Sequence, residues 1–457
     1  MALTEESQAS HRVHAALVQA IEHKRHARSI HVPTVDADVK AKLRGLGHPI
    51  CLFGEFAHNR RDRLREILAN MDATELEALK KDQDESSSDE EIHEEFFTEG
   101  NKALKDTRTW IAHYSLPRAK VRLAQQKEEL AMEPAAVLAP KNEVYQRLKH
   151  FTNSGSQIGD DRPLAHCCFT NDSQQLVTGS WSGGMKLWNV PSSLLAHTWR
   201  GHEQRIGGID VHPESSGSLS RDAANLISGC AEGKVFLWNL TQFDPVGELV
   251  GHKMRVAQAS FHPSGRFAGT SSYDTSWRLW DVETRQEILL QEGHFNEVHG
   301  LSFHCDGSLV ATSGLDCYVR LWDLRSGRGI GVLAGHVKQI HALDFSPNGH
   351  VLASGSDDNT VRIWDLRKAE KKRTLYTIPA HRNLISHVKF EPVHGTYLVT
   401  SSFDNTVGLW ASTDWKNIKT LVGHANKVMC ADTTRDGKII ASCSYDRTFK
   451  LWEQEAA

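Results

Sequence analysis

The feature that most constrains this fold is a tryptophan that recurs seven times over the C-terminal two thirds of the 457-residue chain. Each of these tryptophans follows a Leu or an Ile, and successive members are 50, 42, 42, 42, 46 and 42 residues apart: Trp188, Trp238, Trp280, Trp322, Trp364, Trp410 and Trp452. A Gly-His or Ala-His dipeptide lies upstream of six of them. A repeat of this length needs neighbouring copies to bury its apolar face, so seven copies indicate one repetitive domain.

Each unit reads as short β-rich runs separated by Pro, Gly, Asn and Asp turns, as in "GHVKQIHALDFSPNGHVLASGSDDNTVRIWD". Four strands per unit and a terminal Trp-Asp are the WD-repeat signature, so the sequence predicts a mainly β protein with a seven-bladed propeller over residues 149–457. The chain stops five residues after Trp452 and leaves the last blade one strand short. We expect residues 149–158 to supply the missing outer strand, which closes the ring without a free sheet edge.

Four residue types recur in register with the tryptophan. In the fifth and seventh repeats they are His336, Ser354, Asp358 and Trp364, and His424, Ser442, Asp446 and Trp452. His, Ser and Asp also make up a hydrolytic triad. An active site is needed once, whereas this set recurs with the repeat. We therefore expect a buried structural network in which the indole N–H donates a hydrogen bond.

The first two repeats depart from this set. Asp160 and Ser182 replace the histidine and the aspartate of the first repeat, so we expect its network to be broken. Glu232 replaces the aspartate of the second repeat, which is also longer than the others. Its extra residues, 214–225, are expected to form a surface loop.

Composition and motifs exclude several classes of function. The net charge is -4, so a globally basic surface for nucleic acid is absent, although local patches are compatible with it. There is no 18-residue apolar run and no apolar leader, so we expect a chain that stays inside the cell and crosses no membrane. No Walker, HExxH, nucleophile-elbow or dinucleotide motif is present. We expect a non-enzymatic protein without a cofactor, metal or small-molecule substrate.

The eight cysteines form no CxxC pair and no zinc-finger spacing in the sequence: Cys51, Cys167, Cys168, Cys230, Cys305, Cys317, Cys430 and Cys443. In a reducing compartment they are interpreted as buried free thiols.

One face of the predicted ring combines aromatic and basic side chains. The residue before the acidic turn residue is aromatic in blades one, three, six and seven: Trp181, Tyr273, Phe403 and Tyr445. The third residue after the histidine is basic in three blades: Arg205, Arg255 and Lys427. Such mixtures are typical of protein hot spots and of RNA-stacking surfaces, so we interpret this face as partner-binding. The alternative is that the aromatic rings pack into neighbouring blades.

The N-terminal third has a different character. Residues 1–29 are polar and predicted to be disordered, and residues 30–72 predict a small helical motif. Val35, Val39, Leu43 and Leu46 share one helix face, with Thr34 as a cap and Gly47 near the helix end.

The stretch "GHPICLFGE" then turns the chain and presents Ile50, Leu52 and Phe53. A second helix follows with Arg60, Arg61 and Arg63, and its apolar side contains Leu64. A motif this small does not have a core that is stable alone. We predict that a partner or the propeller covers its apolar surface and that the arginines meet acidic groups or phosphate. A solvated arginine face is the alternative.

Residues 73–95 are predicted to be an acidic linker, in which residues 82–95 contain eight acids and no Lys or Arg. The sequence leaves open whether Ser86 to Ser88 are phosphorylated. Residues 96–148 predict a helical partner-docking segment with Trp110, Ile111 and Tyr114. Ser115 followed by Pro117 predicts the start of a new helix.

The N-terminal motif and the repeats together resemble a known family. "PTVDADVKAKLRGLGHPICLFGE" followed by "RRDRLREIL" is similar to the splicing-factor motif of two families of pre-mRNA processing factors. Of these two families, one also carries a seven-bladed WD-repeat ring, and "EGNKALKDTRTWIAHYSLPRAKVRL" and "SQIGDDRPLAHCCF" resemble its linking segments. The chain thus resembles the Prp4-type family, the WD-repeat proteins of the U4/U6 small nuclear ribonucleoprotein, over roughly residues 30–457.

This resemblance implies a nuclear, non-enzymatic scaffold of the U4/U6 particle and of the U4/U6.U5 tri-snRNP that acts in spliceosome assembly and pre-mRNA splicing. It implies two protein partners, a Prp3-type U4/U6 protein and a spliceosomal cyclophilin, held on paired U4 and U6 RNA. Whether this chain itself contacts RNA is left open. The cyclophilin-docking segment would correspond to about Glu94 to Arg122, including Trp110, Ile111, Tyr114 and Pro117.

A second hypothesis is a substrate receptor of a cullin ubiquitin ligase. "LWDLR" at Leu321 to Arg325 and "IWDLR" at Ile363 to Arg367 fit the Trp-Asp-x-Arg pattern of such receptors. That short pattern is frequent in WD repeats and explains nothing before residue 150, so the splicing hypothesis is favoured.

Overall fold

The computed structural model describes residues 32–33, 36–50, 57–70, 102–215, 218–368 and 374–455. The chain divides into two compact units, residues 1–94 and residues 95–457. The predictions for residues 1–29, for the acidic linker, and for Leu52 and Phe53 concern residues outside the described ranges.

Within its described residues, the first unit contains two helices, α2 (Asp36–Gly45) and α3 (Ala57–Asn70). Their apolar faces meet in a small core of Val32, Val39, Leu43 and Leu64, each at most 2% exposed. After α2 the chain reverses at Gly47, which has a positive φ of 71°. The backbone N–H of His48 donates to the Leu43 carbonyl at 2.9 Å, so this glycine satisfies an otherwise unpaired carbonyl at the helix end.

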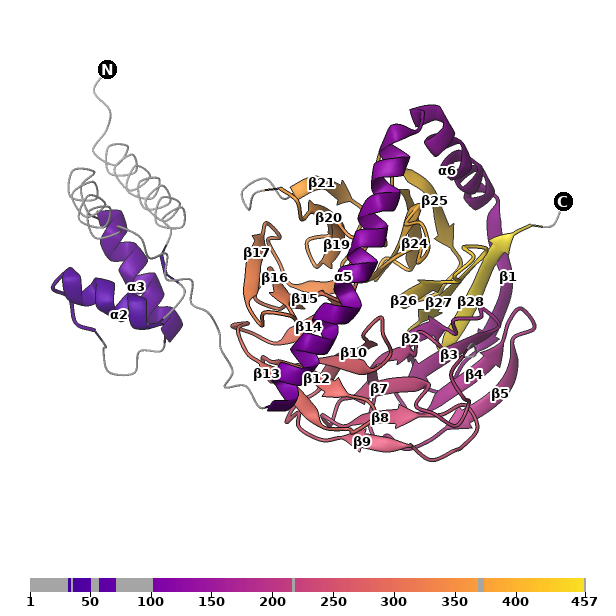
Figure 1. Ribbon diagram of the computed structural model, residues 1–457, viewed down its shortest axis with the longest axis horizontal. Coiled ribbons are helices and arrows are strands. Elements are labelled where there is room, and N and C mark those ends of the chain that lie inside the picture. Colours follow the sequence, from indigo (N-terminus) through magenta and orange to yellow (C-terminus); the bar gives the residue numbers. More distant parts are fainter. Residues whose placement is uncertain are drawn as a thin grey trace, which may run out of the picture. The chain divides into compact units, whose positions relative to one another are not determined.

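The second unit contains a seven-bladed β-propeller of four-stranded antiparallel sheets, which confirms the predicted fold class (Figure 1). Blades 1 to 3 consist of β2 (Leu164–Phe169), β3 (Gln175–Ser180), β4 (Met185–Asn189) and β5 (Leu194–Trp199); β6 (Ile206–Val211), β7 (Leu226–Cys230), β8 (Val235–Trp238) and β9 (Gly247–Leu249); and β10 (Val256–Phe261), β11 (Phe267–Ser272), β12 (Trp277–Asp281) and β13 (Glu287–Gln291).

Blades 4 to 6 consist of β14 (Val298–Phe303), β15 (Leu309–Gly314), β16 (Tyr318–Asp323) and β17 (Gly329–Ala334); β18 (Ile340–Phe345), β19 (Val351–Ser356), β20 (Thr360–Asp365) and β21 (Thr374–Pro379); and β22 (Ile385–Phe390), β23 (Tyr397–Ser402), β24 (Thr406–Ala411) and β25 (Asn417–Val422). The first strand of each blade is the inner one.

Blade 7 joins the two ends of the propeller. It consists of β26 (Val428–Thr433), β27 (Ile439–Ser444), β28 (Thr448–Gln454) and, as its outer strand, β1 (Phe151–Ile158). β1 pairs antiparallel with β28 from Phe151 opposite Gln454 to Ile158 opposite Thr448. Figure 1 shows β1 beside the yellow β28. The predicted closure is therefore confirmed, and every blade has a fourth strand.

The antiparallel strands place the connecting loops on two opposite faces of the ring. One face carries the loops after the second and fourth strands of each blade, which contain the network aspartates and histidines; we call it the histidine face. The other carries the loops after the first and third strands. Figure 1 shows that α5 (Lys102–Ala131) runs across this second face, which we call the helix face, and that α6 (Pro134–Lys149) leads into β1.

The helices are fixed to the propeller by apolar contacts and hydrogen bonds. Leu104 and Ile111 of α5 enter the core between blades 3 and 4, where they lie with Phe267 and Phe303. At the other end, the hydroxyl of Tyr145 on α6 donates to the Thr396 carbonyl at 3.0 Å. The helical segment is thus part of the propeller unit.

The predicted helix start at Ser115 and Pro117 is wrong. α5 continues without a break through Pro117, and the Ser115 side chain is buried. Contacts on both sides of the proline fix the helix: the Tyr114 hydroxyl donates to the Pro263 carbonyl at 3.0 Å, and Arg122 pairs with Asp306. These contacts offset the backbone hydrogen bond that proline removes.

Candidate partner-binding surfaces

The repeated His, Ser and Asp residues form a buried network that ties each blade together. In blade 5, Nδ1 of His336 lies 2.8 Å from Asp358 Oδ2, and its Nε2 lies 2.7 Å from Ser354 Oγ. The indole N–H of Trp364 donates to the same Ser354 oxygen at 2.8 Å. Burial disfavours the Asp358 carboxylate, but hydrogen bonds from His336 and Thr360 outweigh that penalty and hold its pKa below the ordinary value.

Four further repeats have the same geometry, with histidine to aspartate distances of 2.8 to 3.0 Å. In blade 7 the network comprises His424, Ser442, Asp446 and Trp452, with the indole N–H 2.8 Å from the serine oxygen. Each serine or threonine hydroxyl contacts both the histidine and the tryptophan, and it lies on the second strand of its blade. The arrangement supports a structural role and offers no free nucleophile.

The first two blades contain incomplete networks. In blade 1 Asp160 accepts hydrogen bonds from Ser180 and Ser182, while Trp188 donates separately to Thr178 at 2.8 Å. In blade 2 His202 contacts Ser228 at 2.7 Å, but its Nδ1 has no hydrogen-bond partner among the described residues. Glu232 pairs instead with Lys234 at 3.1 Å. Burial, with a smaller contribution from Lys234, lowers the pKa of His202 to about 4.

The histidine face brings together the aromatic and basic residues that the sequence pattern selects. The guanidinium of Arg205 lies 5.4 Å from the Trp181 ring centre, that of Arg255 lies 5.0 Å from the Tyr273 ring centre, and Lys427 Nζ lies 4.8 Å from the Phe403 ring centre. These are cation–π distances. Arg205 and Lys427 each belong to the blade after the one that carries their aromatic partner, whereas Arg255 and Tyr273 belong to the same blade. The basic and aromatic residues thus form pairs.

These pairs are only partly covered. Trp181 packs edge-on against Tyr445 of blade 7 at 5.3 Å, so the interpretation that aromatic rings pack between blades describes this pair. Tyr445 nevertheless remains 39% exposed. Arg205, Arg255, Trp181 and Tyr273 line an open hollow of about 860 Å³ on this face.

The hollow also contains a cation that the sequence pattern missed, Arg162. The rule of three residues after the histidine gives Pro163 in the first repeat, so the rule fails by one position where Asp160 replaces the histidine. Burial, together with the positive charge of Arg205, lowers the pKa of Arg255 against the opposing effect of Tyr273. Its Nε is buried without a hydrogen-bond partner in the described part of the chain. An anionic group would stabilise this cluster.

The predicted docking segment on α5 is divided between the propeller and solvent. Ile111 is fully buried in the core between blades 3 and 4, so in this structure it is not available to another protein. Trp110 stacks on Tyr114 at 5.3 Å and meets Phe267 edge-on at 5.4 Å, which leaves both side chains partly buried. Pro117 is exposed.

The solvent side of α5 carries a second feature that the sequence reasoning missed. Three leucines recur every seven residues along it, with exposed fractions of 57%, 51% and 87%: Leu116, Leu123 and Leu130. Seven-residue spacing places them on one helix face, which was the available signal.

The arginines of the first unit have different environments. Arg60 is 6% exposed and pairs with Asp36 of α2. Arg63 donates to the Pro49 carbonyl at 2.9 Å, which fixes the turn before Ile50. Arg61 and Ile50 are partly exposed. Arg60 and Arg63 therefore contribute to the internal structure of this unit.

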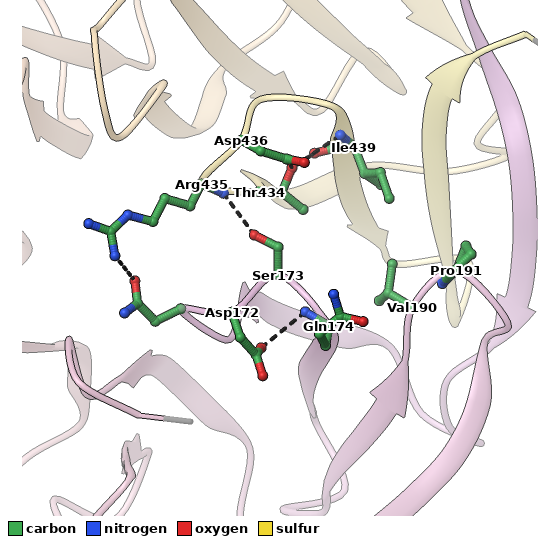
Figure 2. Close-up of a pocket in the computed structure, with 10 residues that line it drawn as sticks. Asp172, Ser173, Gln174, Val190, Pro191, Thr434, Arg435, Asp436 and Ile439 are labelled. Carbon is green, nitrogen blue, oxygen red and sulfur yellow. Dashed lines mark hydrogen bonds between the residues drawn. The ribbon is translucent and has the colours of Figure 1, made fainter. Parts of the chain in front are cut away.

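Another hollow, of about 510 Å³, lies at the seam between blades 1 and 7 on the helix face (Figure 2). Figure 2 shows the backbone N–H of Arg435 donating to Ser173 Oγ, at 3.1 Å, and Gln174 donating to Asp172. Arg435 also donates to Asn171 Oδ1 at 2.9 Å, so both of these Arg435 hydrogen bonds cross the seam. Gln174 and Asp172, in contrast, belong to the same loop. The two Arg435 bonds hold the closing blade against the first one.

The arginines of the two Trp-Asp-x-Arg sequences bind their own repeats. Arg325 Nε lies 3.1 Å from Asp323 Oδ1, and Arg367 donates to both carboxylate oxygens of Asp365 at 3.0 Å. This contact is intramolecular and does not favour the ligase-receptor hypothesis over any other WD-repeat function. None of the helices in the described ranges has the length and apolar character needed to cross a membrane.

Comparisons with known proteins agree with both units. The family model "WD domain, G-beta repeat" matches seven segments: residues 153–189, 194–239, 243–281, 285–323, 327–365, 372–411 and 415–453. The model "pre-mRNA processing factor 4 (PRP4) like" matches residues 39–67, which span parts of α2 and α3.

Full-length relatives carry the same combination. The chain is 54% identical to the human "U4/U6 small nuclear ribonucleoprotein Prp4" and 53% identical to the mouse protein of that name, in each case over 96% of this chain and 84% of the relative. It is 41% identical to "U4/U6 small nuclear ribonucleoprotein PRP4" of Saccharomyces cerevisiae, over 92% of this chain and 90% of the relative. These identities extend over the N-terminal motif and the propeller together, and the chain belongs to the U4/U6 small nuclear ribonucleoprotein Prp4 family.

Proposed function

We propose that this chain is a nuclear, non-enzymatic scaffold of the U4/U6 particle and the U4/U6.U5 tri-snRNP, acting in spliceosome assembly. The observation that carries the proposal is the alignment with U4/U6 ribonucleoprotein Prp4 proteins over 96% of the chain. The repeated polar residues of the propeller bond to one another within each blade, and other surfaces are left for partners. This arrangement suits a scaffold.

We propose that three surfaces of this chain bind different partners. The α2–α3 unit and the outer side of α5, with Leu116, Leu123 and Pro117, bind the Prp3-type protein and the spliceosomal cyclophilin. The histidine face, with Arg205 and Arg255, binds an anionic group of the particle. Three arginines and one carboxylate, Glu203, line the hollow on that face, so its net charge is positive. A positive potential steers anionic partners toward such a surface.

Pull-down assays with purified full-length chain and purified partners test this division. On the histidine face, Arg205→Glu with Arg255→Glu is compared with a matched charge change elsewhere, Lys416→Glu with Lys438→Glu, whose lysines are 82% and 67% exposed. On α5, Leu116→Glu with Leu123→Glu is compared with Lys120→Glu. Circular dichroism establishes that each variant is folded.

We expect the histidine-face pair to weaken capture of U4/U6 RNA particles at least about tenfold, with a weaker salt dependence, and the matched pair to have little effect. We expect the α5 pair to reduce capture of one of the two proteins. Equal binding by all folded variants would contradict the assignment of these surfaces. Repeating the assay with naked U4/U6 RNA distinguishes direct RNA contact from an acidic protein.

A further inference from the structure

Three side chains capable of binding a metal meet at the inner strands of three consecutive blades, near the centre of the ring. They are His166 on β2 of blade 1, His387 on β22 of blade 6 and Cys430 on β26 of blade 7. One donor atom from each, two imidazole nitrogens and a sulfur, lie within 4.8 Å of one another. The two imidazole rings meet edge-on with centres 5.4 Å apart. His166 is 8% exposed and Cys430 is 1% exposed.

The repeat explains why these residues meet although His166 is more than 200 positions from His387 and Cys430 in the sequence. Each is the first residue after the register shift in the inner strand of its blade, so the three occupy one level of the ring. At the same register position the other four blades carry residues that do not provide such ligands: Gly208, Gln258, Gly300 and Ala342. Potential ligands are therefore confined to the arc formed by blades 6, 7 and 1.

The hydrogen bonds of this cluster leave metal-binding atoms unused. Both ring nitrogens of His166 are buried and have no hydrogen-bond partner within the described ranges. A buried imidazole in this state is unusual because buried polar groups are nearly always paired. His387 contacts the Ala431 carbonyl through Nδ1 at 3.0 Å. That bond fixes Nδ1 as the protonated nitrogen and leaves the Nε2 lone pair available, the arrangement that histidine ligands of metals usually have.

Two more thiols stand next to Cys430. The Cys430 thiol donates to the Cys167 carbonyl at 3.5 Å, Cys443 is the cross-strand partner of Cys430, and all three cysteines are free and buried. Among the described residues, the group here whose donor atoms all lie within 4.8 Å of one another comprises His166, His387 and Cys430 without either of these two cysteines. Two imidazoles with one thiolate form a nitrogen and sulfur donor set, which suits tetrahedral Zn²⁺ and is a poor match for Mg²⁺ or Ca²⁺.

We propose that His166, His387 and Cys430 bind one Zn²⁺, with a water molecule in the fourth position. Donor atoms within 4.8 Å of one another need to approach by about an ångström to reach the separations of a tetrahedral site, which inner-strand side chains achieve by small rotations. Binding releases the thiol proton to solvent, since the ligand is the thiolate. The ion would link blades 6, 7 and 1, where the ring is closed by β1.

Metal analysis of the full-length chain, purified without chelator, tests the proposal. We expect about one equivalent of zinc per chain, the stoichiometry of a single structural site. Replacing it with Co²⁺ should give the absorption of tetrahedral cobalt together with a sulfur-to-cobalt charge-transfer band. Cys430→Ser should abolish that band, and His166→Gln should weaken metal affinity by more than the roughly 100-fold that loss of an outer hydrogen-bond partner causes.

The matched control is His341→Gln. His341 also lies on an inner strand and meets His299 edge-on at 4.8 Å, but its Nε2 is paired with Asp357 at 2.8 Å and no thiol joins that pair. This variant should retain the metal and the cobalt spectrum. A folded wild-type chain with far less than one equivalent of zinc and no charge-transfer band in excess Co²⁺ would overturn the proposal. An unchanged band in Cys430→Ser would overturn it as well.

Should Cys430→Ser fail to fold, the wild-type chain alone decides the question. A chelator should then lower its thermal midpoint, and restoring Zn²⁺ should recover it. A midpoint that is indifferent to chelator and to added Zn²⁺, in a chain without bound metal, contradicts the site.

Discussion

Arg122 and Asp306 form a bidentate ion pair that joins α5 to blade 4. Arg122 Nε lies 3.1 and 3.0 Å from the two carboxylate oxygens of Asp306, and Nη2 lies 2.6 Å from one of them. The Arg122 side chain also donates to the Asn348 carbonyl at 3.0 Å in blade 5. Burial opposes the charge of Arg122, but Asp306 outweighs it, so the pKa of Arg122 is raised. One side chain therefore holds the helix across two blades.

We predict that Arg122→Leu detaches the C-terminal half of α5. The loss should be about 1 to 3 kcal/mol of local stability, because Asp306 is left buried without its partner. Hydrogen exchange should increase in residues 116–131 while Leu104 and Ile111 keep the first half in place. The matched variant Arg118→Leu removes an exposed contact with the Cys305 carbonyl and should have little effect. Equal protection in both variants would contradict this role of Arg122.

The blade network gives a second prediction. Ser354→Ala removes the oxygen shared by His336 and Trp364, which leaves two buried nitrogens without partners. The free energy of unfolding measured in urea should fall by about 2 to 3 kcal/mol. Ser192→Ala, on an exposed turn, should change it by less than about 0.5 kcal/mol. Partner binding by the folded Ser354→Ala protein should persist, since the network is structural. Loss of binding without loss of stability would refute this.

The incomplete network of blade 2 predicts a pH dependence of stability. The folded chain keeps His202 neutral because burial lowers its pKa to about 4, whereas the unfolded chain takes up a proton near pH 6.5. The contribution of neutral His202 is therefore intact above pH 6.5 and is lost as the pH falls from about 6.5 to 4. The whole shift amounts to about 3 kcal/mol. Urea unfolding measured across this pH range checks it.

Glu232→Asp is the variant that isolates this histidine. An aspartate at this position accepts from the histidine in five other blades, at 2.8 to 3.0 Å. We expect the substitution to pair His202 Nδ1, raise its pKa and flatten the pH dependence between 6.5 and 4. A wild-type slope that persists in the variant would assign the dependence to other groups.

The α2–α3 unit should be the least stable part of the molecule, because its described core consists of four buried residues. Leu64→Ala removes a fully buried side chain, and a change of this kind costs about 2 to 5 kcal/mol. We predict that hydrogen-exchange protection disappears in residues 36–50 and 57–70 while the propeller transition is unchanged. Glu66→Ala, on the exposed side of α3, serves as the control. Retained protection in Leu64→Ala would mean that the unit has further support.

The repeat made the propeller predictable, because one signal recurs seven times and a missed strand is visible as a gap in the pattern. The closure by β1 followed from counting: Trp452 stands on a third strand and the chain ends before a fourth. The same reasoning predicted the broken network of blade 1, where Asp160 and Ser182 interrupt the pattern, and it identified the replacement of the aspartate by Glu232 in blade 2.

Features that depend on contacts between distant segments could not be predicted from the sequence. Ile111 looked like a docking residue because helical periodicity does not say whether the partner is another protein or the same chain. Pro117 looked like a helix start because local propensity omits the tertiary contacts around it. The His166, His387 and Cys430 cluster has no short-range spacing at all, and it emerges once three inner strands are placed in register.

The central claim is that this chain is a component of the U4/U6 particle, and affinity purification of the tagged full-length chain tests it most directly. Wild type is compared with Phe53→Asp combined with Arg61→Glu, with hydrogen exchange used to establish that the α2–α3 unit and the propeller remain folded. We predict recovery of U4 and U6 RNA together with a Prp3-type protein by wild type, and reduced recovery by the variant. Recovery of a ubiquitin-ligase adaptor without small nuclear RNA would contradict the account.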